Sequence, residues 1–199
     1  MFGNNYFFML DQALVFIKDT LNNYLMTQMK LTESVVVINP IVGTEGKSIA
    51  ENENKLVISL INLENESNQP YNVRYSHVNN KQVANVQPDV RFNLDLLLAA
   101  NFSVYEESLK FLSSAIGFFQ LNPSLDEVRT PQIPKQVGRL DFHVESLNYF
   151  EMHNLWSSMG AKYQPSIVYK VRLVKFQGEE IVNVSNSIVQ TGVEALPIS

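Results

Sequence analysis

The first thirty residues carry apolar side chains at helical spacing. They recur every three or four residues, at Leu10, Leu14, Ile17, Leu21 and Leu25, with polar residues such as Lys18 and Asn22 between them. This spacing places the apolar side chains on one face of a helix. The pattern therefore predicts one long amphipathic helix from residue 5 to about residue 30.

Runs of β-branched and alternating residues then predict strands. Residues 33–41 and 55–67 are rich in valine, isoleucine and leucine, and the second run is apolar on both faces, which is typical of a central strand. Residues 71–80 and 89–102 predict two more strands. The polar segment 42–54, with its two glycines, is predicted to be a loop, and residues 81–89 a turn.

Two shorter helices follow. Ser103 and Glu106 have the spacing of a capping box, ahead of apolar residues at helical intervals: Tyr105, Leu109, Leu112, Ile116 and Phe119. This helix is expected to end at Asn122-Pro123. Asn148 and Glu151 repeat the capping spacing before Leu155 and Trp156, and Gly160 stands where a C-terminal cap belongs.

The second half contains a loop, two strands and a tail. Residues 122–138 hold three prolines and have no period, so they are predicted to form a loop. Residues 139–147 alternate, with Leu140, Phe142 and Val144 on one face. From Ser166 the alternation is clearest, since Ile167, Tyr169, Val171 and Leu173 face away from Val168, Lys170 and Arg172. Residues after Gly178 are β-branched and lightly charged, which is typical of an extended arm.

Composition narrows the class of protein. The 199 residues are 45% hydrophobic and 18% charged, so they can bury a core, and the length favours a single domain. A net charge of −5 without a basic block makes nucleic acid an unexpected partner. The absence of cysteine favours a reducing cytoplasm. No apolar run has the length of a membrane helix, so we expect no membrane insertion.

No motif indicates catalysis. The three histidines, His77, His143 and His153, have no metal-binding spacing, and the segment GTEGKS lacks the spacer of a phosphate loop. Adjacent carboxylate pairs are better explained as solvated surface. Trp156 is interpreted as a packing anchor rather than a pocket residue. The prediction is a protein that is not an enzyme and has no catalytic residue, metal site or cofactor.

Two stretches, taken together, resemble a known family. They are VRFNLDLLLAANFSVYEESLKFLSSAIGFFQLNP and LDFHVESLNYFEMHNLWSSMGAKYQPSIVYKVRLVKF. They resemble the N-terminal domain of cap, or tail-terminator, proteins of phage-tail-like contractile injection systems of the antifeeding-prophage type. The shared features are a strand entering an LDLLL-type run, an acidic helix ending near Asn-Pro, a helix that carries Leu-Trp, and the motif YxPSxxYxVR. The motif residues are Trp156, Tyr163, Pro165, Ser166, Tyr169 and Arg172.

The resemblance implies a structural role in a bacterial contractile particle. It implies a ring, expected to be a hexamer, that ends and joins the inner tube and the contractile sheath. The partners would be other copies of the chain, the sheath protein and the inner tube protein. Assembly would take place in the bacterial cytoplasm, and the finished particle would be either released or attached to a membrane.

The predicted architecture is α+β: a single mixed, mainly antiparallel sheet packed by a long N-terminal helix and two shorter helices. We expect a tail-terminator-like domain over residues 1–177 and an extended C-terminal arm over residues 178–199. Strand addition by that arm, or at the sheet edge it leaves open, would join the sheath. The candidate interface residues are Lys170, Arg172, Ile181, Val182, Val184, Ile188 and Val189.

Two alternatives stay open at this point. The first is another tube-end or adaptor component of the same particle. The second is a small-molecule-binding domain or hydrolase, in which residues 122–138 would close as a lid over Trp156. A pocket with convergent polar groups beside that tryptophan would favour the second alternative.

Overall fold

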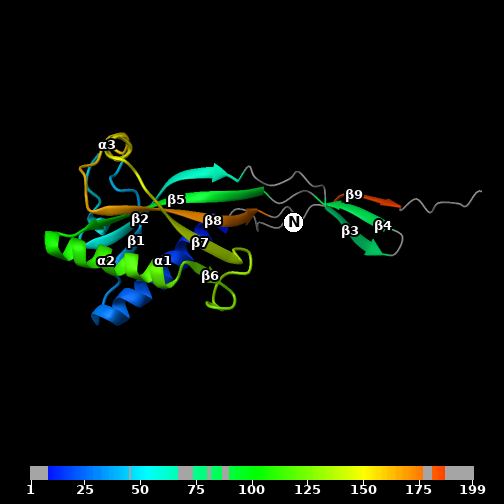
Figure 1. Ribbon diagram of the computed structural model, residues 1–199, viewed down its shortest axis with the longest axis horizontal. Helices are drawn as coiled ribbons and strands as arrows, with labels where there is room; N and C mark the ends of the chain where they lie inside the picture. Colours follow the sequence, from blue (N-terminus) through cyan, green and yellow to red (C-terminus); the bar gives the residue numbers. More distant parts are fainter. Residues whose placement is uncertain are drawn as a thin grey trace, which may run out of the picture. The chain divides into compact units, whose positions relative to one another are not determined.

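The chain divides into two compact units. The computed structural model describes residues 9–44, 46–66, 74–79, 82–86, 90–176 and 181–186. The larger unit takes its described residues from the ranges 1–67 and 91–176, and the smaller unit from 68–90 and 177–199. Figure 1 shows the helices and strands of both units.

The larger unit is built on a six-stranded sheet with the strand order β1-β2-β5-β8-β7-β6. The strands are β1 (Val36–Ile38), β2 (Lys55–Asn65), β5 (Val90–Asn101), β6 (Ser124–Asp126), β7 (Arg139–Glu145) and β8 (Ser166–Phe176). β1 and β2 run parallel, whereas the pairs β2–β5, β6–β7 and β7–β8 are antiparallel. The predicted α+β class with a mixed, mainly antiparallel sheet is confirmed.

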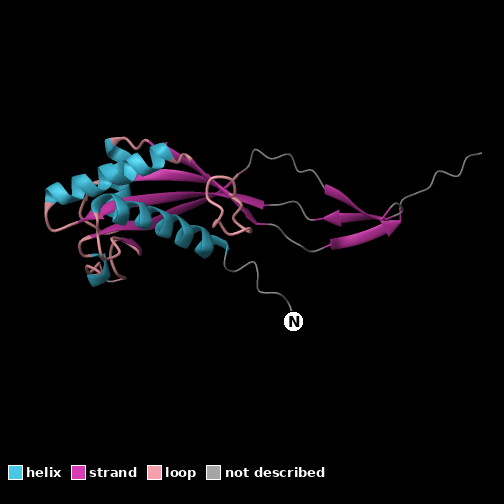
Figure 2. Cartoon of the chain, turned by 90° about the horizontal axis from the view of Figure 1, so that it is seen from below, coloured by secondary structure: helices cyan, strands magenta, loops and turns pink. Residues whose placement is uncertain are grey.

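Three helices cover this sheet, as expected. They are α1 (Met9–Met29), α2 (Tyr105–Leu121) and α3 (Tyr149–Ser158). Figures 1 and 2 show α1 and α2 on one face of the sheet, and Figure 1 shows α3 on the other. A single turn of 3-10 helix, Ala50–Asn52, interrupts the predicted loop over residues 42–54.

The period-two pattern of the strands supplies a core on each face. On one side Leu94, Leu96 and Leu98 of β5 pack in the same cluster as Ile17 of α1 and Phe118 of α2. The intervening residues of β5 point the other way, so Leu97 and Ala99 join Trp156 of α3 in a second cluster. β2 lies between β1 and β5, which confirms that the residues apolar on both faces form an internal strand.

The smaller unit is a three-stranded antiparallel sheet, in which β3 lies within the strand predicted over residues 71–80 and the pairing was not predicted. It contains β3 (Arg74–Asn79), β4 (Gln82–Val86) and β9 (Ile181–Asn186), in the order β3-β4-β9. The predicted turn over residues 81–89 is wrong, because β4 occupies most of it. Hydrogen bonding to a strand on each side stabilises a segment whose own strand propensity is weak.

The two predicted capping boxes have different outcomes. At α3 the Asn148 side chain accepts hydrogen bonds from the backbone N–H groups of Phe150 and Glu151, at 2.9 and 3.0 Å, and the Glu151 carboxylate accepts one from the Asn148 backbone N–H at 2.9 Å. At α2 the N-cap is Val104, without a side-chain bond. Ser103 instead hydrogen-bonds through its backbone N–H and its hydroxyl to the side chain of Asn54, each at 3.0 Å, so the predicted box of Ser103 and Glu106 is wrong.

The predicted helix ends agree with the structure, whereas the predicted buried face of α2 agrees only in part. Gly160 has φ +66° directly after α3, as a left-handed C-terminal cap requires. α2 ends at Leu121, beside Asn122-Pro123, as expected. Its buried face only partly matches the predicted stripe: Phe119 is buried as predicted, but Tyr105 and Leu109 are 67% and 43% exposed, and Ala115 and Phe118, outside the stripe, are buried. The predicted loop over residues 122–138 also contains β6.

Candidate interaction surface

One face of the large sheet is only partly covered by α3. Beyond that helix the same face carries charged and amide side chains from four neighbouring strands. Cross-strand partners share a face of a sheet, and here the pairs are Asn62 with Asp95, His143 with Lys170, and Asp141 with Arg172. We call this the polar face; its residues are Asn62, Glu64, Asn93, Asp95, Asp141, His143, Glu145, Lys170 and Arg172.

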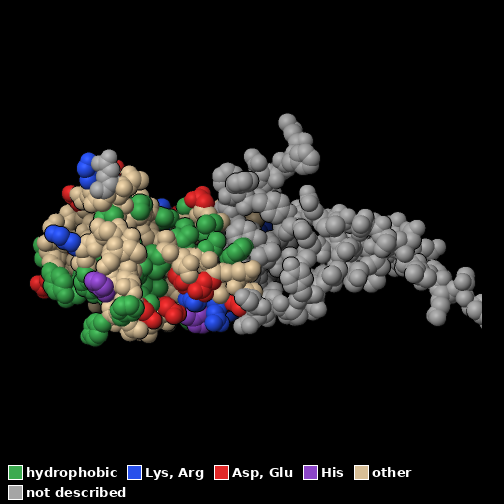
Figure 3. All heavy atoms as spheres, turned by 90° about the horizontal axis from the view of Figure 1, so that it is seen from above, with side chains coloured by type: hydrophobic (Ala, Val, Ile, Leu, Met, Phe, Trp, Pro, Cys, Tyr) green, Lys and Arg blue, Asp and Glu red, His purple; other side chains and the backbone are tan. Residues whose placement is uncertain are grey.

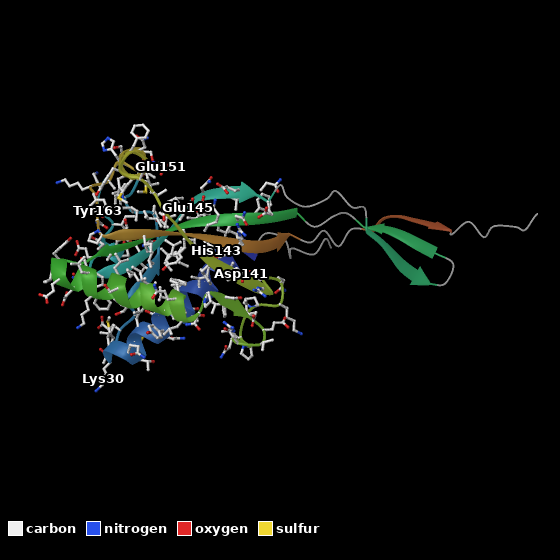
Figure 4. The ribbon with its side chains drawn as sticks, viewed as in Figure 1. Lys30, Asp141, His143, Glu145, Glu151 and Tyr163 are labelled. Atoms are coloured by element: carbon white, nitrogen blue, oxygen red, sulfur yellow. The ribbon has the colours of Figure 1, made fainter. Side chains whose placement is uncertain are left out.

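Figure 3 looks onto the side of α3 and shows acidic, basic and histidine side chains gathered there beside apolar ones. In Figure 4, Asp141, His143 and Glu145 follow one another along β7. The surface thus mixes both signs of charge. Such a surface favours a partner whose charges match the arrangement, because juxtaposed like charges are penalised.

Lys170 lies at the centre of the polar face. Its Nζ is 3.0 Å from Glu64 Oε2 and 3.9 Å from Asp95 Oδ1. The hydrogen bond to Glu64 and the neighbouring carboxylates raise the pKa of Lys170. Burial raises the pKa of Asp95, although the hydrogen bond from Asn62 Nδ2, at 3.0 Å, and the charge of Lys170 oppose that effect.

Arg139 and Asp141 form a second charged pair along β7. The Arg139 guanidinium donates to both carboxylate oxygens of Asp141 at 2.8 to 3.0 Å. Partial burial alone would raise the pKa of Asp141, but the hydrogen bonds from Arg139 and the charge of Arg139 lower it. Asp141 is therefore held in its charged form beside Arg172, which is exposed.

Trp156 is buried in the core between α3 and the sheet. Only 4% of its surface is exposed, and its ring meets that of Tyr163 edge-on at a centroid distance of 5.6 Å. Its indole Nε1 is buried without a hydrogen-bond partner. Trp156 also lines a pocket of about 180 Å³, whose lining is apolar except for Glu145 and Ser166. Two polar lining residues do not make the convergent polar site that the small-molecule alternative requires.

The remaining motif residues lie around the start of β8. The Pro165 carbonyl accepts a hydrogen bond from the Ala100 N–H at 2.9 Å, which joins β8 to the end of β5. Ser166 is the first residue of β8. Tyr169 is buried against Phe119, at a centroid distance of 4.6 Å, and its hydroxyl has no partner. Burial raises the pKa of Tyr169 to about 12.

The candidate interface residues of the tail fall into two groups. Ile181, Val182 and Val184 lie in β9, which pairs with β4 of the same chain. Ile188 and Val189 lie outside the described residues. A role for either group in binding another chain stays a prediction, as does the division of the chain at residue 177.

Sequence reasoning missed a buried amide at one edge of the large sheet. Asn22 of α1 uses its Oδ1 to accept hydrogen bonds from the backbone N–H groups of Val35 and Val36, at 2.9 and 3.2 Å. It therefore occupies donors that an added strand would need. A polar residue inside the predicted amphipathic helix was the available signal, but its partner is twelve or more residues away in sequence.

Two further properties concern the described residues alone. They contain no group of three or more histidine, cysteine or carboxylate side chains that could hold a metal ion. Among them, no helix combines the length and the apolar character that crossing a bilayer would demand.

The fold occurs in terminators of contractile injection particles. One similar structure is the sheath/tube terminator of PVC, an extracellular contractile injection system, in its extended state: the TM-score is 0.55 at 13% identity, covering 97% of this chain and 62% of that one. Another is the anti-feeding prophage cap, a tube terminating cap, with a TM-score of 0.56 at 13% identity, covering 93% and 60%. The chain thus spans somewhat under two thirds of the length of either protein.

The sequence itself defines the family. Residues 14–190 match the family described as the Pvc16 N-terminal domain, and the chain belongs to that family. No curated protein matches the sequence. The resemblance found in the LDLLL-type strand, the Leu-Trp helix and the YxPSxxYxVR motif is confirmed.

Proposed function

We propose that this protein is a structural cap of a contractile injection particle, forming a ring of six copies where the inner tube and the contractile sheath end. The observation that carries the proposal is the family match over residues 14–190, together with a shared fold over 97% of the chain with a sheath/tube terminator. The partners are other copies of the chain, the sheath protein and the inner tube protein. No catalytic step is part of the proposal.

The strand edges indicate where a partner strand would add. The edge strands of the large sheet, β1 and β6, have three residues each, and Asn22 occupies backbone donors beside β1. Short, covered edges resist strand addition. The edge strands of the small sheet, β3 and β9, have six residues each. We therefore assign the contact with a sheath strand to the small sheet.

Removing residues 179–199 tests that contact. The deletion removes β9 but leaves all six strands of the large sheet, which end at Phe176. We expect a folded protein that no longer co-purifies with sheath. A matched control removes residues 187–199 only, which keeps β9. Unchanged co-purification of the longer deletion with sheath would contradict the assignment of this contact to the small sheet.

Negative-stain microscopy of the purified chain tests the ring. Six-subunit rings support the cap, and strict monomers at high concentration contradict it. The same preparation, mixed with purified tube and purified sheath, separates a cap from a component that meets only one of the two polymers. Assembly is proposed to take place in the bacterial cytoplasm, with the particle then released or attached to a membrane.

A further inference from the structure

The pocket beside Trp156 has the chemistry of a site for a short peptide segment. Apolar side chains line most of it, among them Leu97, Leu147 and Met152. Glu145 is exposed, so its carboxylate lies where the pocket meets solvent. A suitable occupant therefore combines an apolar side chain with a positive charge.

The connection between β6 and β7 presents both features on a rigid turn. Asp126 Oδ1 accepts hydrogen bonds from the backbone N–H groups of Val128 and Arg129, at 3.1 and 2.9 Å, and the Asp126 carbonyl accepts one from Thr130 at 2.8 Å. Val128 is nevertheless 90% exposed, and Arg129 is exposed beside it. A turn already fixed by its own hydrogen bonds loses little conformational entropy on binding.

The turn fits the pocket in size. The pocket has a volume of about 180 Å³, and an engineered apolar cavity of roughly 150 Å³ admits benzene. The side chain of Val128 is smaller than benzene, so it can enter while the longer Arg129 reaches Glu145 at the mouth. The size of Val128 thus suits the pocket, and the charge of Arg129 is opposite to that of Glu145.

The turn and the pocket belong to different sides of the large unit. Figures 1 and 2 show the β6–β7 connection on the side of the sheet that α1 and α2 cover, and Figure 1 shows α3 on the other side. One copy therefore cannot fill its own pocket. Because the two surfaces differ, the contact is heterologous, and repeating it around a closed rotation yields a ring.

We propose that the Val128–Arg129 turn of one copy docks into the Trp156 pocket of the next, with Arg129 against Glu145. This inference rests on the proposed ring and names the surfaces that close it. Docking would also bury Val128, which is 90% exposed in the single chain.

Charge reversal on each side of the contact tests the proposal. Arg129→Glu and Glu145→Lys each place like charges in the docked pair, and each is expected to weaken self-association at least about tenfold. Mixing the two variants restores matched charges at every junction, so association should recover. Lys135→Glu, in the same connection, and Glu33→Lys, at a residue that does not line the pocket, are exposed controls of equal charge change that should behave as the unaltered chain does.

Mass measurement by light scattering over a concentration series gives the readout, with Trp156 emission as a probe inside the pocket. We expect the emission of this only tryptophan to shift on association in the unaltered chain. Rings that persist in both single variants would overturn the contact and leave the ring standing. A chain that never associates overturns the ring itself. Variants that form normal rings but lose sheath binding would assign the pocket to a sheath segment instead.

Discussion

Lys170 Nζ lies 3.0 Å from Glu64 Oε2, and this contact ties β8 to β2 across the intervening strand β5. Asp95 of β5 lies next to this pair, with its Oδ1 3.9 Å from Lys170 Nζ. Only 12% of the Asp95 side chain and 21% of the Lys170 side chain are exposed. Partial shielding from solvent strengthens the Coulomb attraction between these groups, and removal of one partner leaves the other charge uncompensated. The lysine balances two carboxylates on a face where a third, Glu145, also raises its pKa.

Removing this lysine should destabilise the large unit. Lys170→Met keeps the aliphatic stem but leaves the nearly buried Asp95 without its positive neighbour. We expect the free energy of unfolding to fall by about 1–2 kcal/mol, the typical cost of leaving a buried polar group uncompensated. Chemical denaturation at neutral pH measures the change. Lys110→Met on the exposed side of α2 is the matched control, and an equal loss there would contradict the argument.

Two aspartates of the polar face should respond to pH in opposite directions. Asp95 has a raised pKa, so the folded protein holds this proton more tightly than the unfolded chain, and stability falls as pH rises from 3.8 through that raised value. Asp141 has a lowered pKa, so its contribution is present above pH 3.8 and is lost as pH falls through the lowered value.

The corresponding asparagine variants separate the two effects. Relative to the unaltered chain, Asp95→Asn should gain stability as pH rises above 4, whereas Asp141→Asn should lose its disadvantage as pH falls below 4. Unfolding curves across pH 2.5 to 7 give both slopes. Parallel slopes in the two variants would show that the environments of these carboxylates have been misassigned.

The hydroxyl of Tyr169 should be dispensable for folding. It is buried without a hydrogen-bond partner, so Tyr169→Phe removes an unsatisfied group and should leave the free energy of unfolding within about 1 kcal/mol, or raise it. With its pKa at about 12, Tyr169 keeps its proton in the folded state while the unfolded chain ionises near pH 10. The unaltered chain should therefore lose more stability between these two pH values than the phenylalanine variant does. A large loss at neutral pH would reveal a partner for the hydroxyl.

The two capping sequences give a contrast within one protein. Asn148→Ala removes both hydrogen bonds that the asparagine side chain accepts at α3 and should cost about 1 kcal/mol. Ser103→Ala removes only the hydroxyl bond to Asn54, while the Ser103 backbone N–H keeps its own. We expect the smaller loss at Ser103. Thermal unfolding of both variants, followed by circular dichroism, makes the comparison.

Local patterns predicted the large unit well because its strands and helices bury residues at their own periods. The alternation from Ser166 gives β8, and the helical spacing from Leu10 to Leu25 gives α1. The pattern also placed Lys170 and Arg172 on one face. It could not predict that Glu64 and Asp95 meet Lys170, because Glu64 is 106 residues away along the chain.

The strand β4 and the pairing within the small unit escaped prediction for a related reason, although β3 lies within the strand predicted over residues 71–80. β4 has a weak pattern of its own and is stabilised by β3 and by β9, from residues nearly 100 positions later. Pairing between distant segments leaves no local periodicity to read. The error at Ser103 is of another kind, since a residue with the right spacing found a different partner in Asn54.

The most direct test of the proposed function is where the chain lies in an assembled particle. A small tag on the chain, marked with gold-labelled antibody or ligand, can be located in negative-stain images of purified particles. The account predicts label at one end only, where tube and sheath stop together, and particles of irregular length when the chain is absent. Label distributed along the sheath, or particles of normal length without the chain, would contradict it.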